Sequence, residues 1–154
     1  MTRTSRGRAA VVEAVVAVAI LLVIAAASAG SGPNSRQELA KWGRTGVPAI
    51  TALVEDIAPL QREVSVTAPT GPVVSAVDVV ALRSQLAQVR QLKAPPTAAT
   101  AAAWNTALAE MTTALRLVGG AGSHPSDAIA ETVAAQLSAA GQHLLGLGQT
   151  IQLG

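Results

Sequence analysis

The chain begins with one long apolar stretch and continues with segments in which apolar residues recur at helical spacing. From Ala9 to Ala29 the one charged residue is Glu13, and this run of 21 residues would be about 31 Å long as a helix. That length matches a membrane hydrocarbon core of about 30 Å. Three arginines precede the run and an Ala-x-Ala sequence ends it, which is also the order of a secretory signal peptide.

Two interpretations of residues 1–29 are therefore open: a signal anchor that stays in the membrane, and a signal peptide that is cleaved before Gly30. The length of the apolar run favours the anchor, whereas Ala27-Ser28-Ala29 supplies a cleavage site. In both cases the arginines keep the N-terminus in the cytoplasm, and we expect the rest of the chain to be exported. A buried helix of a soluble domain is the third alternative, but it would make both the arginines and the Ala-x-Ala site coincidental.

Residues 30–34 form a Gly- and Ser-containing linker in this interpretation, and residues 35–154 form the domain. Its first segment shows an apolar face at the helical period from Leu39 to Val64. Ser35 and Glu38 have the spacing of a capping box, which predicts that the helix starts at Ser35. Pro48 predicts a kink or break near residues 43–47, with Pro48 in the first turn of a renewed helix.

Three more helices are predicted after a loop at residues 67–75 that is rich in Pro, Gly and Thr. One is capped by Ser75 or Asp78 and continues to Lys93, the next covers about residues 98–118, and the last begins at Ser126. Four such helices predict an all-α fold, an antiparallel four-helix bundle. The expected core positions are Leu39, Trp42, Gly46, Ile50, Leu53, Ile57, Leu60, Val64, Val79, Leu82, Leu86, Val89, Trp104, Leu108, Met111, Leu115, Val118, Ile129, Val133, Leu137, Ala140, Leu144, Leu147 and Ile151.

The core predicted from this pattern contains few large side chains. Hydrophobic residues make up 50% of the chain, yet Trp42 and Trp104 are its only aromatic residues. Alanine and valine bury little area each, so we expect modest stability and a large contribution from the two tryptophans. In the last helix, small residues permit a close approach of a neighbouring helix: Ala130, Ala134, Ser138 and Gly141. Gly141, Gly146 and Gly148 mark either a close contact with a helix, another copy or a ligand, or a fraying end.

Charge and cysteine content exclude several classes of function. The net charge of +2 comes from the N-terminal segment, because eight basic and eight acidic residues follow residue 30. The domain therefore lacks the positive charge that nucleic-acid binding requires, and no nucleic-acid partner is expected. The absence of cysteine excludes disulfides, thiolate nucleophiles, Cys-ligated metals and a lipid-modified cysteine.

No motif predicts a catalytic, cofactor-binding or metal-binding residue. His124 and His143 are the only histidines, and neither forms a Glu-x-x-His or His-Glu-x-x-His motif. Ser123 and His124 are adjacent, so we expect their side chains to diverge, and no Gly-x-Ser-x-Gly sequence is present. The glycines at residues 119–122 follow no strand and precede no Lys-Ser/Thr pair, which indicates an interhelical turn.

The remaining charged residues are interpreted as surface groups. Glu55 and Asp56 project about 100° apart on a helix, so they cannot share a proton as a catalytic pair does. Arg83, Arg90 and Lys93 are expected to pair with acidic residues of the first helix across the bundle, rather than to bind an anion.

The order of features resembles small exported or membrane-tethered, alanine-rich helical proteins of actinobacteria, a group without an assigned function. The features are the N-terminal segment, Trp42 in the first helix, a helix ending in Pro95-Pro96, the sequence AAAWNTALAEM and an alanine-rich last helix. The resemblance implies a cell-envelope location and brings no catalytic residues with it.

We therefore expect a non-enzymatic protein of the cell envelope that acts as an accessory, scaffold or interaction module. Its expected partners are the membrane, through the N-terminal segment, and another envelope protein. The alternative is a helical carrier of an apolar ligand such as a lipid. A scaffold should have a packed interior and an exposed apolar patch, whereas a carrier should have an elongated apolar cavity and should copurify with lipid. A hydrolase would need a cleft with a paired nucleophile and base.

Overall fold

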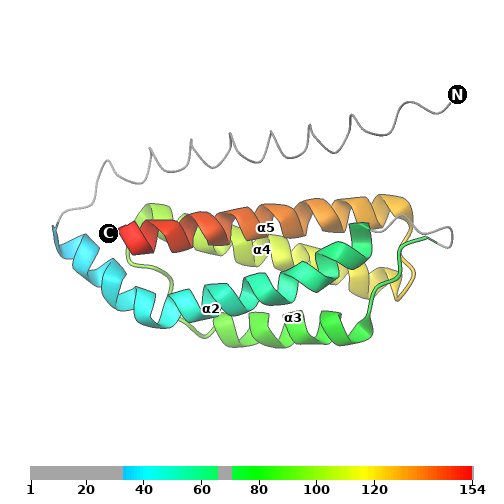
Figure 1. Ribbon diagram of the computed structural model, residues 1–154, viewed down its shortest axis with the longest axis horizontal. Coiled ribbons are helices and arrows are strands. Elements are labelled where there is room, and N and C mark those ends of the chain that lie inside the picture. Colours follow the sequence, from blue (N-terminus) through cyan, green and yellow to red (C-terminus); the bar gives the residue numbers. More distant parts are fainter. Residues whose placement is uncertain (1–32, 66–70, 154) are drawn as a thin grey trace, which may run out of the picture.

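The computed structural model describes residues 33–65 and 71–153 (Figure 1). This part of the chain contains four α-helices and no strand: α2 (Pro33–Ser65), α3 (Ala76–Val89), α4 (Ala98–Ala121) and α5 (Asp127–Leu153). The prediction of an all-helical fold is therefore confirmed. The predicted anchor or signal at residues 1–29 lies outside the described residues. None of the four helices combines the length and apolarity that crossing a membrane requires.

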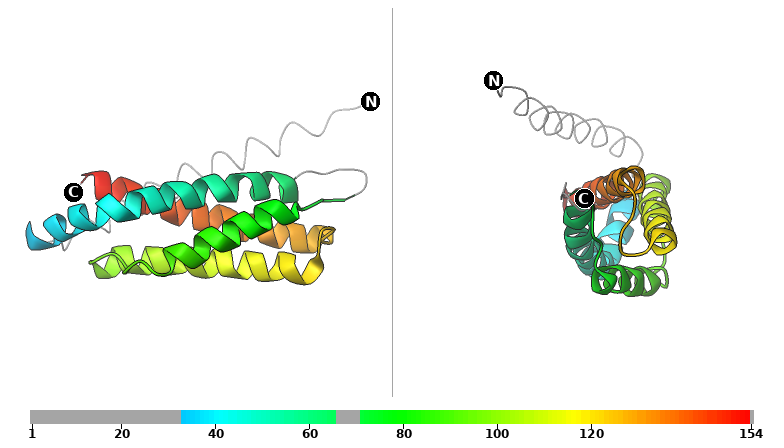
Figure 2. Two further views of the ribbon diagram at one scale, coloured as in Figure 1. Left: turned by 90° about the horizontal axis from the view of Figure 1, so that it is seen from below. Right: turned by 90° about the vertical axis from the view of Figure 1, so that its right-hand side faces the viewer.

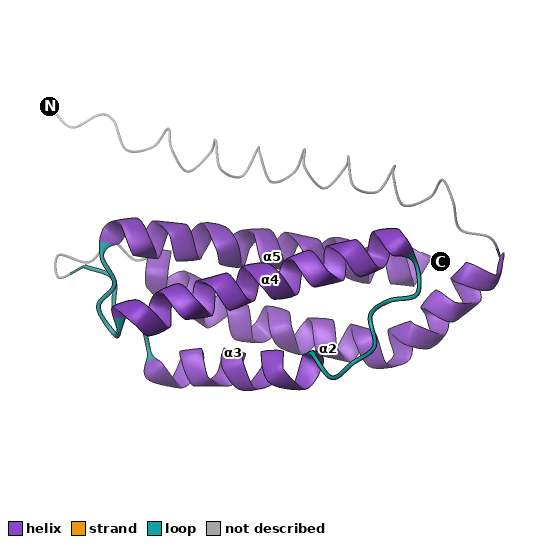
Figure 3. Ribbon diagram, turned by 180° about the vertical axis from the view of Figure 1, so that it is seen from behind, coloured by secondary structure: helices purple, strands orange, loops and turns teal. Residues whose placement is uncertain are grey.

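Successive helices run in opposite directions and form an up-and-down bundle (Figures 1 and 3). Seen end-on, the four helices surround a common axis, and each lies beside the helices that precede and follow it in the order α2, α3, α4, α5 (Figure 2). α5 packs along both α4 and α2, whereas the shorter α3 makes its main contact with α2 and a smaller one with α4. The side of the bundle between α3 and α4 is therefore its most open side.

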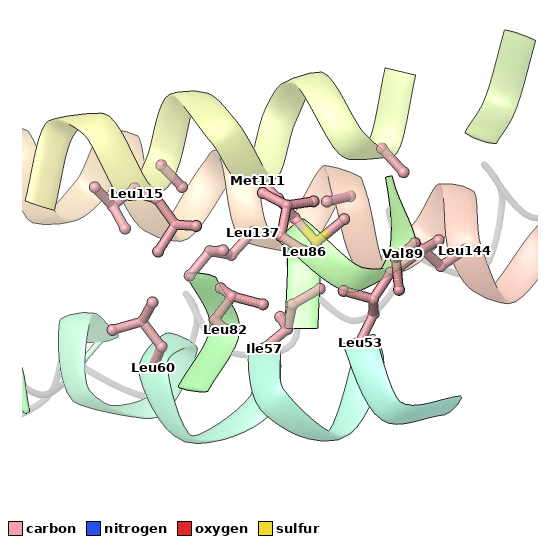
Figure 4. Close-up of a cluster of buried hydrophobic side chains, with 14 of the residues drawn as sticks. Leu53, Ile57, Leu60, Leu82, Leu86, Val89, Met111, Leu115, Leu137 and Leu144 are labelled. Carbon is pink, nitrogen blue, oxygen red and sulfur yellow. The ribbon is translucent and has the colours of Figure 1, made fainter. Parts of the chain in front are cut away.

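The core consists of the apolar faces that the sequence pattern predicts (Figure 4). Trp42, Leu108 and Ile129 are partly buried, and the other predicted core positions are buried. The largest side chains that are fully buried are Trp104, Leu53, Leu60, Leu82, Met111, Leu137 and Leu144. Alanines also belong to the core, and Ala107, Ala114 and Ala140 have no exposed surface. Leucines from all four helices thus form one continuous packed interior.

α2 differs from the sequence prediction at its start and at its first internal proline. The helix begins at Pro33 rather than at Ser35, because proline lacks the N–H that would be unpaired in a first turn. It continues through Pro48 without a break, so Pro48 lies inside the helix and not at a new start. The N-terminal part of α2 nevertheless bends away from the rest of the helix, as a proline-induced kink requires (Figures 1 and 3).

A small residue brings α2 and α5 together near this bend. Gly43 is buried, and a Cβ atom added to it would lie 2.5 Å from Cγ2 of Ile151. In contrast, an added Cβ at Gly141, Gly146 or Gly148 would meet no described atom within 4 Å. The interpretation of these three glycines as helix contacts is therefore wrong for the described part of the chain. α5 continues past them to Leu153.

α3 begins where it was expected and ends earlier. Ser75 is its N-cap and accepts a hydrogen bond from the N–H of Val77 at 3.2 Å. The helix ends at Val89 rather than at Lys93, because the N–H groups of Gln91 and Leu92 donate to carbonyls three residues back and close a turn. The chain then crosses to α4, for which Thr97 is the N-cap.

The connections at the opposite end of the bundle contact each other. Residues 71–75 are not helical, as predicted, and the N–H of Val74 donates to the carbonyl of Ser123 at 3.0 Å. α4 continues past the predicted residue 118 to Ala121 and ends at Gly122, which has a φ of 74°. Gly122 thus has the positive φ expected at a helix exit. Ser126 precedes α5 as predicted, and its hydroxyl accepts from the N–H of Ile129.

Candidate functional site

The two tryptophans join three parts of the chain at one end of α3. Nε1 of Trp42 donates a hydrogen bond to the main-chain carbonyl of Lys93 at 2.7 Å. The rings of Trp42 and Trp104 meet edge to face, with 5.4 Å between their centroids. Gly46 leaves the space on α2 that the Trp42 ring occupies. This arrangement holds the connection between α3 and α4 against α2.

Glu110 and His143 form a contact between α4 and α5. Nε2 of His143 lies 3.7 Å from Oε1 of Glu110, and 19% of the glutamate side chain is exposed. Oε2 of Glu110 is buried and has no hydrogen-bond partner among the described residues. Burial raises the pKa of Glu110, while the neighbouring His143 acts in the opposite direction. The His143 side chain, which is 38% exposed, is thus the described group that partly offsets the effect of burial on Glu110.

The side chains of Ser123 and His124 were expected to diverge, but they lie close together. The hydroxyl of Ser123 lies 2.9 Å from Nδ1 of His124, within hydrogen-bond distance. The turn that follows Gly122 brings the two adjacent side chains together, a local geometry that residue spacing does not reveal. Both side chains are exposed, and this pair lies on the surface between α4 and α5.

Asp56 of α2 lies near an acidic residue of α3, Asp78. Burial, followed by repulsion from Glu55 and Asp78, raises the pKa of Asp56. The predicted ion pairs between these acids and Arg83, Arg90 or Lys93 are not formed within the described residues, whose one ion pair is His143–Glu110. The prediction is wrong because both arginines lie on the opposite flank of α3, toward α4.

Arg83 and Arg90 instead line a groove between α3 and α4, together with Arg116 of α4. The groove has a volume of about 290 Å³, and its other lining residues are Leu86, Ala87, Thr112 and Leu115. One N–H of Arg90 donates to the hydroxyl of Thr112 at 2.5 Å. We call this feature the arginine groove. The sequence signal was the seven-residue spacing of the two arginines on α3, which places them on one flank of the helix.

The outward side of α3 carries a second feature that the sequence analysis missed. Val77 and Val80 are 75% and 61% exposed, and Val73, just before the helix, is 49% exposed. The exposed residues around them on this side include Ala76, Ala81, Ser84 and Gln88, and the exposed Arg83 of the arginine groove borders this surface. We call this surface the α3 contact face. Its signal in the sequence was the presence of valines outside the buried period of Val79, Leu82, Leu86 and Val89.

Metal-ligating side chains do not converge in the described residues, where no group of three or more His, Asp and Glu residues could hold an ion. Comparison of the chain with family models, with curated proteins and with solved structures gives no match. Within residues 33–65 and 71–153, the arginine groove and the α3 contact face are surface features on which a function can be argued.

Proposed function

We propose that this chain is a non-enzymatic interaction module of the cell envelope, which binds a partner protein through the α3 contact face. In this proposal residues 1–29 export the domain, either as a membrane anchor or as a signal peptide cleaved before Gly30. The observation that carries the proposal is the exposure of Val77 and Val80, two apolar side chains three residues apart on one face of α3.

The physical reason is that the free energy would fall if a partner removed Val77 and Val80 from water. Burying a valine fully is worth about 1.5 to 3 kcal/mol relative to leaving it exposed. Contiguous exposed apolar surface, as opposed to single scattered residues, is typical of interaction sites. Val77 and Val80 are three residues apart on one helix, so a single partner surface can cover both.

The interior of the bundle supports contact at the surface over enclosure of a ligand. Leucines from α2, α3 and α5 and Met111 from α4 meet in the core without exposed surface (Figure 4). A carrier of an apolar chain would need to separate these side chains to admit its ligand. The lipid-carrier alternative therefore requires a loss of packing contacts in the core, which the interaction module does not require.

The test is the assembly state of the full chain in its own host, with V77D/V80D compared with A102D/A135D. Both pairs add two negative charges at exposed positions, but Ala102 and Ala135 lie on α4 and α5. We expect V77D/V80D to shift the protein from a larger complex to its free form on native gels, and A102D/A135D to leave the complex intact. The melting temperatures of both variants should stay near that of the parent.

Two results would contradict the proposal. One is an unchanged complex in V77D/V80D, which would show that the α3 contact face is not used. The other is stoichiometric lipid extracted from the purified protein, which would favour the carrier. Mass spectrometry of the N-terminus from membrane and soluble fractions separates the anchor from the cleaved signal.

A further inference from the structure

The arginine groove contains a guanidinium group that is held in place before any ligand arrives. The hydroxyl of Thr112 donates to the carbonyl of Leu108 at 2.6 Å and accepts from Nη2 of Arg90. The hydroxyl proton of Thr112 is therefore used in the hydrogen bond to the helix backbone, and the hydroxyl oxygen accepts the hydrogen bond from Arg90. This fixes the side chain of Arg90 against α4 and leaves its other N–H groups available.

Two more guanidinium groups lie along the same groove. Nη2 of Arg83 is 3.4 Å from the position of a Cβ atom added to Gly119, so the Arg83 side chain reaches across to α4. It lies at the other end of the groove from Arg90. Arg116 lies on α4 between Thr112 and Gly119, about one helical turn from each. The three arginines thus occupy about two turns, or roughly 10 Å, of the α3–α4 boundary.

No described carboxylate neutralises this charge. The ion pair found in the described ranges joins Glu110 to His143 at the boundary of α4 and α5, and the groove lining contains no acidic residue. Arg116 lies about one helical turn, or about 5 Å, along this boundary from each of the other two arginines, which is less than the Debye length of about 8 Å at physiological ionic strength, so neighbouring guanidinium groups repel each other. An anion in the groove would remove that repulsion.

We infer that the arginine groove binds a phosphate-bearing ligand, with Arg83, Arg90 and Arg116 as its ligands and Thr112 as a positioning residue for Arg90. Guanidinium groups form paired hydrogen bonds with phosphate oxygens, which makes arginine better suited to phosphate than lysine is. The apolar side chains of Leu86, Ala87 and Leu115 line the rest of the groove. The phosphate could belong to a soluble molecule or to a lipid headgroup, and the inference does not depend on the α3 contact face.

The first measurement is a titration of the full chain in neutral detergent micelles with inorganic pyrophosphate. The nitrogen-15 resonances of the arginine Nε–Hε groups report on each guanidinium separately. We expect the resonances of Arg83, Arg90 and Arg116 to shift until the groove is saturated with pyrophosphate. The resonances of the arginines on α2 should not shift. The shifts should decrease as salt is added, because the groove is open to solvent.

Two triple variants with the same net charge separate a site from general attraction. R83Q/R90Q/R116Q removes the groove charge, whereas R36Q/R44Q/R62Q removes three exposed charges from α2. We expect the first variant to bind pyrophosphate at least about tenfold more weakly and the second to lose less than about twofold. T112V keeps every charge and should weaken binding by about threefold, because Arg90 loses its anchor.

The lipid arm uses the full chain in nanodiscs of phosphatidylcholine, with and without phosphatidylglycerol. Shifts of the same three resonances with phosphatidylglycerol assign the phosphate to a headgroup, and shifts with pyrophosphate alone assign it to a soluble ligand. Either result supports the inference. The absence of shifts in both arms, or an equal loss of affinity in the two triple variants, would overturn it.

Discussion

The indole N–H of Trp42 donates to the carbonyl of Lys93 at 2.7 Å, while its ring packs against that of Trp104. These contacts join α2, α4 and the connection between α3 and α4, which are far apart in the sequence. The chain contains no other Trp, Tyr or Phe, so this pair is its one contact between large aromatic rings. We expect this contact to help hold α3 in position, together with its buried residues Leu82, Leu86 and Val89.

Trp104→Ala should lower the free energy of unfolding by about 3 to 5 kcal/mol, because the ring is almost completely buried and would leave a cavity. Chemical denaturation followed by far-ultraviolet circular dichroism measures this loss. Leu145→Ala is the matched control, since Leu145 is 52% exposed and its truncation should cost less than about 1 kcal/mol. Equal losses in the two variants would exclude a core role for Trp104.

Trp42→Phe keeps an aromatic ring but removes the hydrogen bond to the carbonyl of Lys93. We expect a loss of about 1 kcal/mol in the free energy of unfolding. Hydrogen exchange should also become faster at the amides of Gln91 and Leu92, which form the turn after α3. A variant with unchanged exchange in this turn would show that the indole bond does not hold the connection.

Substitutions of glycine by alanine should have opposite effects in α2 and α5. At Gly46 the new Cβ would overlap the Trp42 ring, so we expect a loss of about 1 to 3 kcal/mol. At Gly146 the new Cβ enters open space in a helix interior, and we expect a gain of about 0.5 to 1 kcal/mol. Thermal unfolding of the two variants measures the difference. A stabilising Gly46→Ala would contradict the described packing of Trp42.

Glu110→Gln should change how stability depends on pH. Burial raises the pKa of Glu110 above its ordinary value of 4.5, so the folded protein binds more protons than the unfolded chain at this carboxyl. The stabilisation that comes from this extra proton binding is fully present below the pKa that Glu110 has in the unfolded chain. It is lost as pH rises through the pKa of Glu110 in the folded protein.

The variant should therefore match the parent at about pH 4 and be more stable by about 1 kcal/mol at about pH 8, where an unpaired carboxylate oxygen is otherwise buried. Melting temperatures across this range measure the effect, and Glu131→Gln, at an exposed position of α5, is the control. If the parent protein instead became more stable than Glu110→Gln as pH rises, the raised pKa of Glu110 would be contradicted.

The apolar period of the sequence was sufficient to predict the core, because buried leucines such as Leu53 and Leu137 recur on one face of each helix. Helix ends were less predictable. The connection after α3 is held by the Trp42 hydrogen bond to Lys93, which joins residues 51 positions apart. A local pattern cannot contain that contact.

The surface features depended on information that periodicity lacks. The period indicates which face of α3 is buried, but not whether its flank with Arg83 and Arg90 lies beside α2 or α4. The ion-pair prediction assumed α2, and the structure places these arginines beside Thr112 and Arg116 of α4. Val77 was visible as an apolar residue outside the buried period, and that mismatch was the available signal of the α3 contact face.

Site-specific photocrosslinking in the native host tests the proposed contact function most directly. A photoreactive amino acid at Val77 of the full chain is compared with the same amino acid at Ala102 and Ala135, two exposed positions on other helices. The account predicts one discrete protein adduct from position 77 and none of that mass from the two controls. No adduct at position 77, or the same adducts at all three positions, would contradict the claim that the α3 contact face binds a partner.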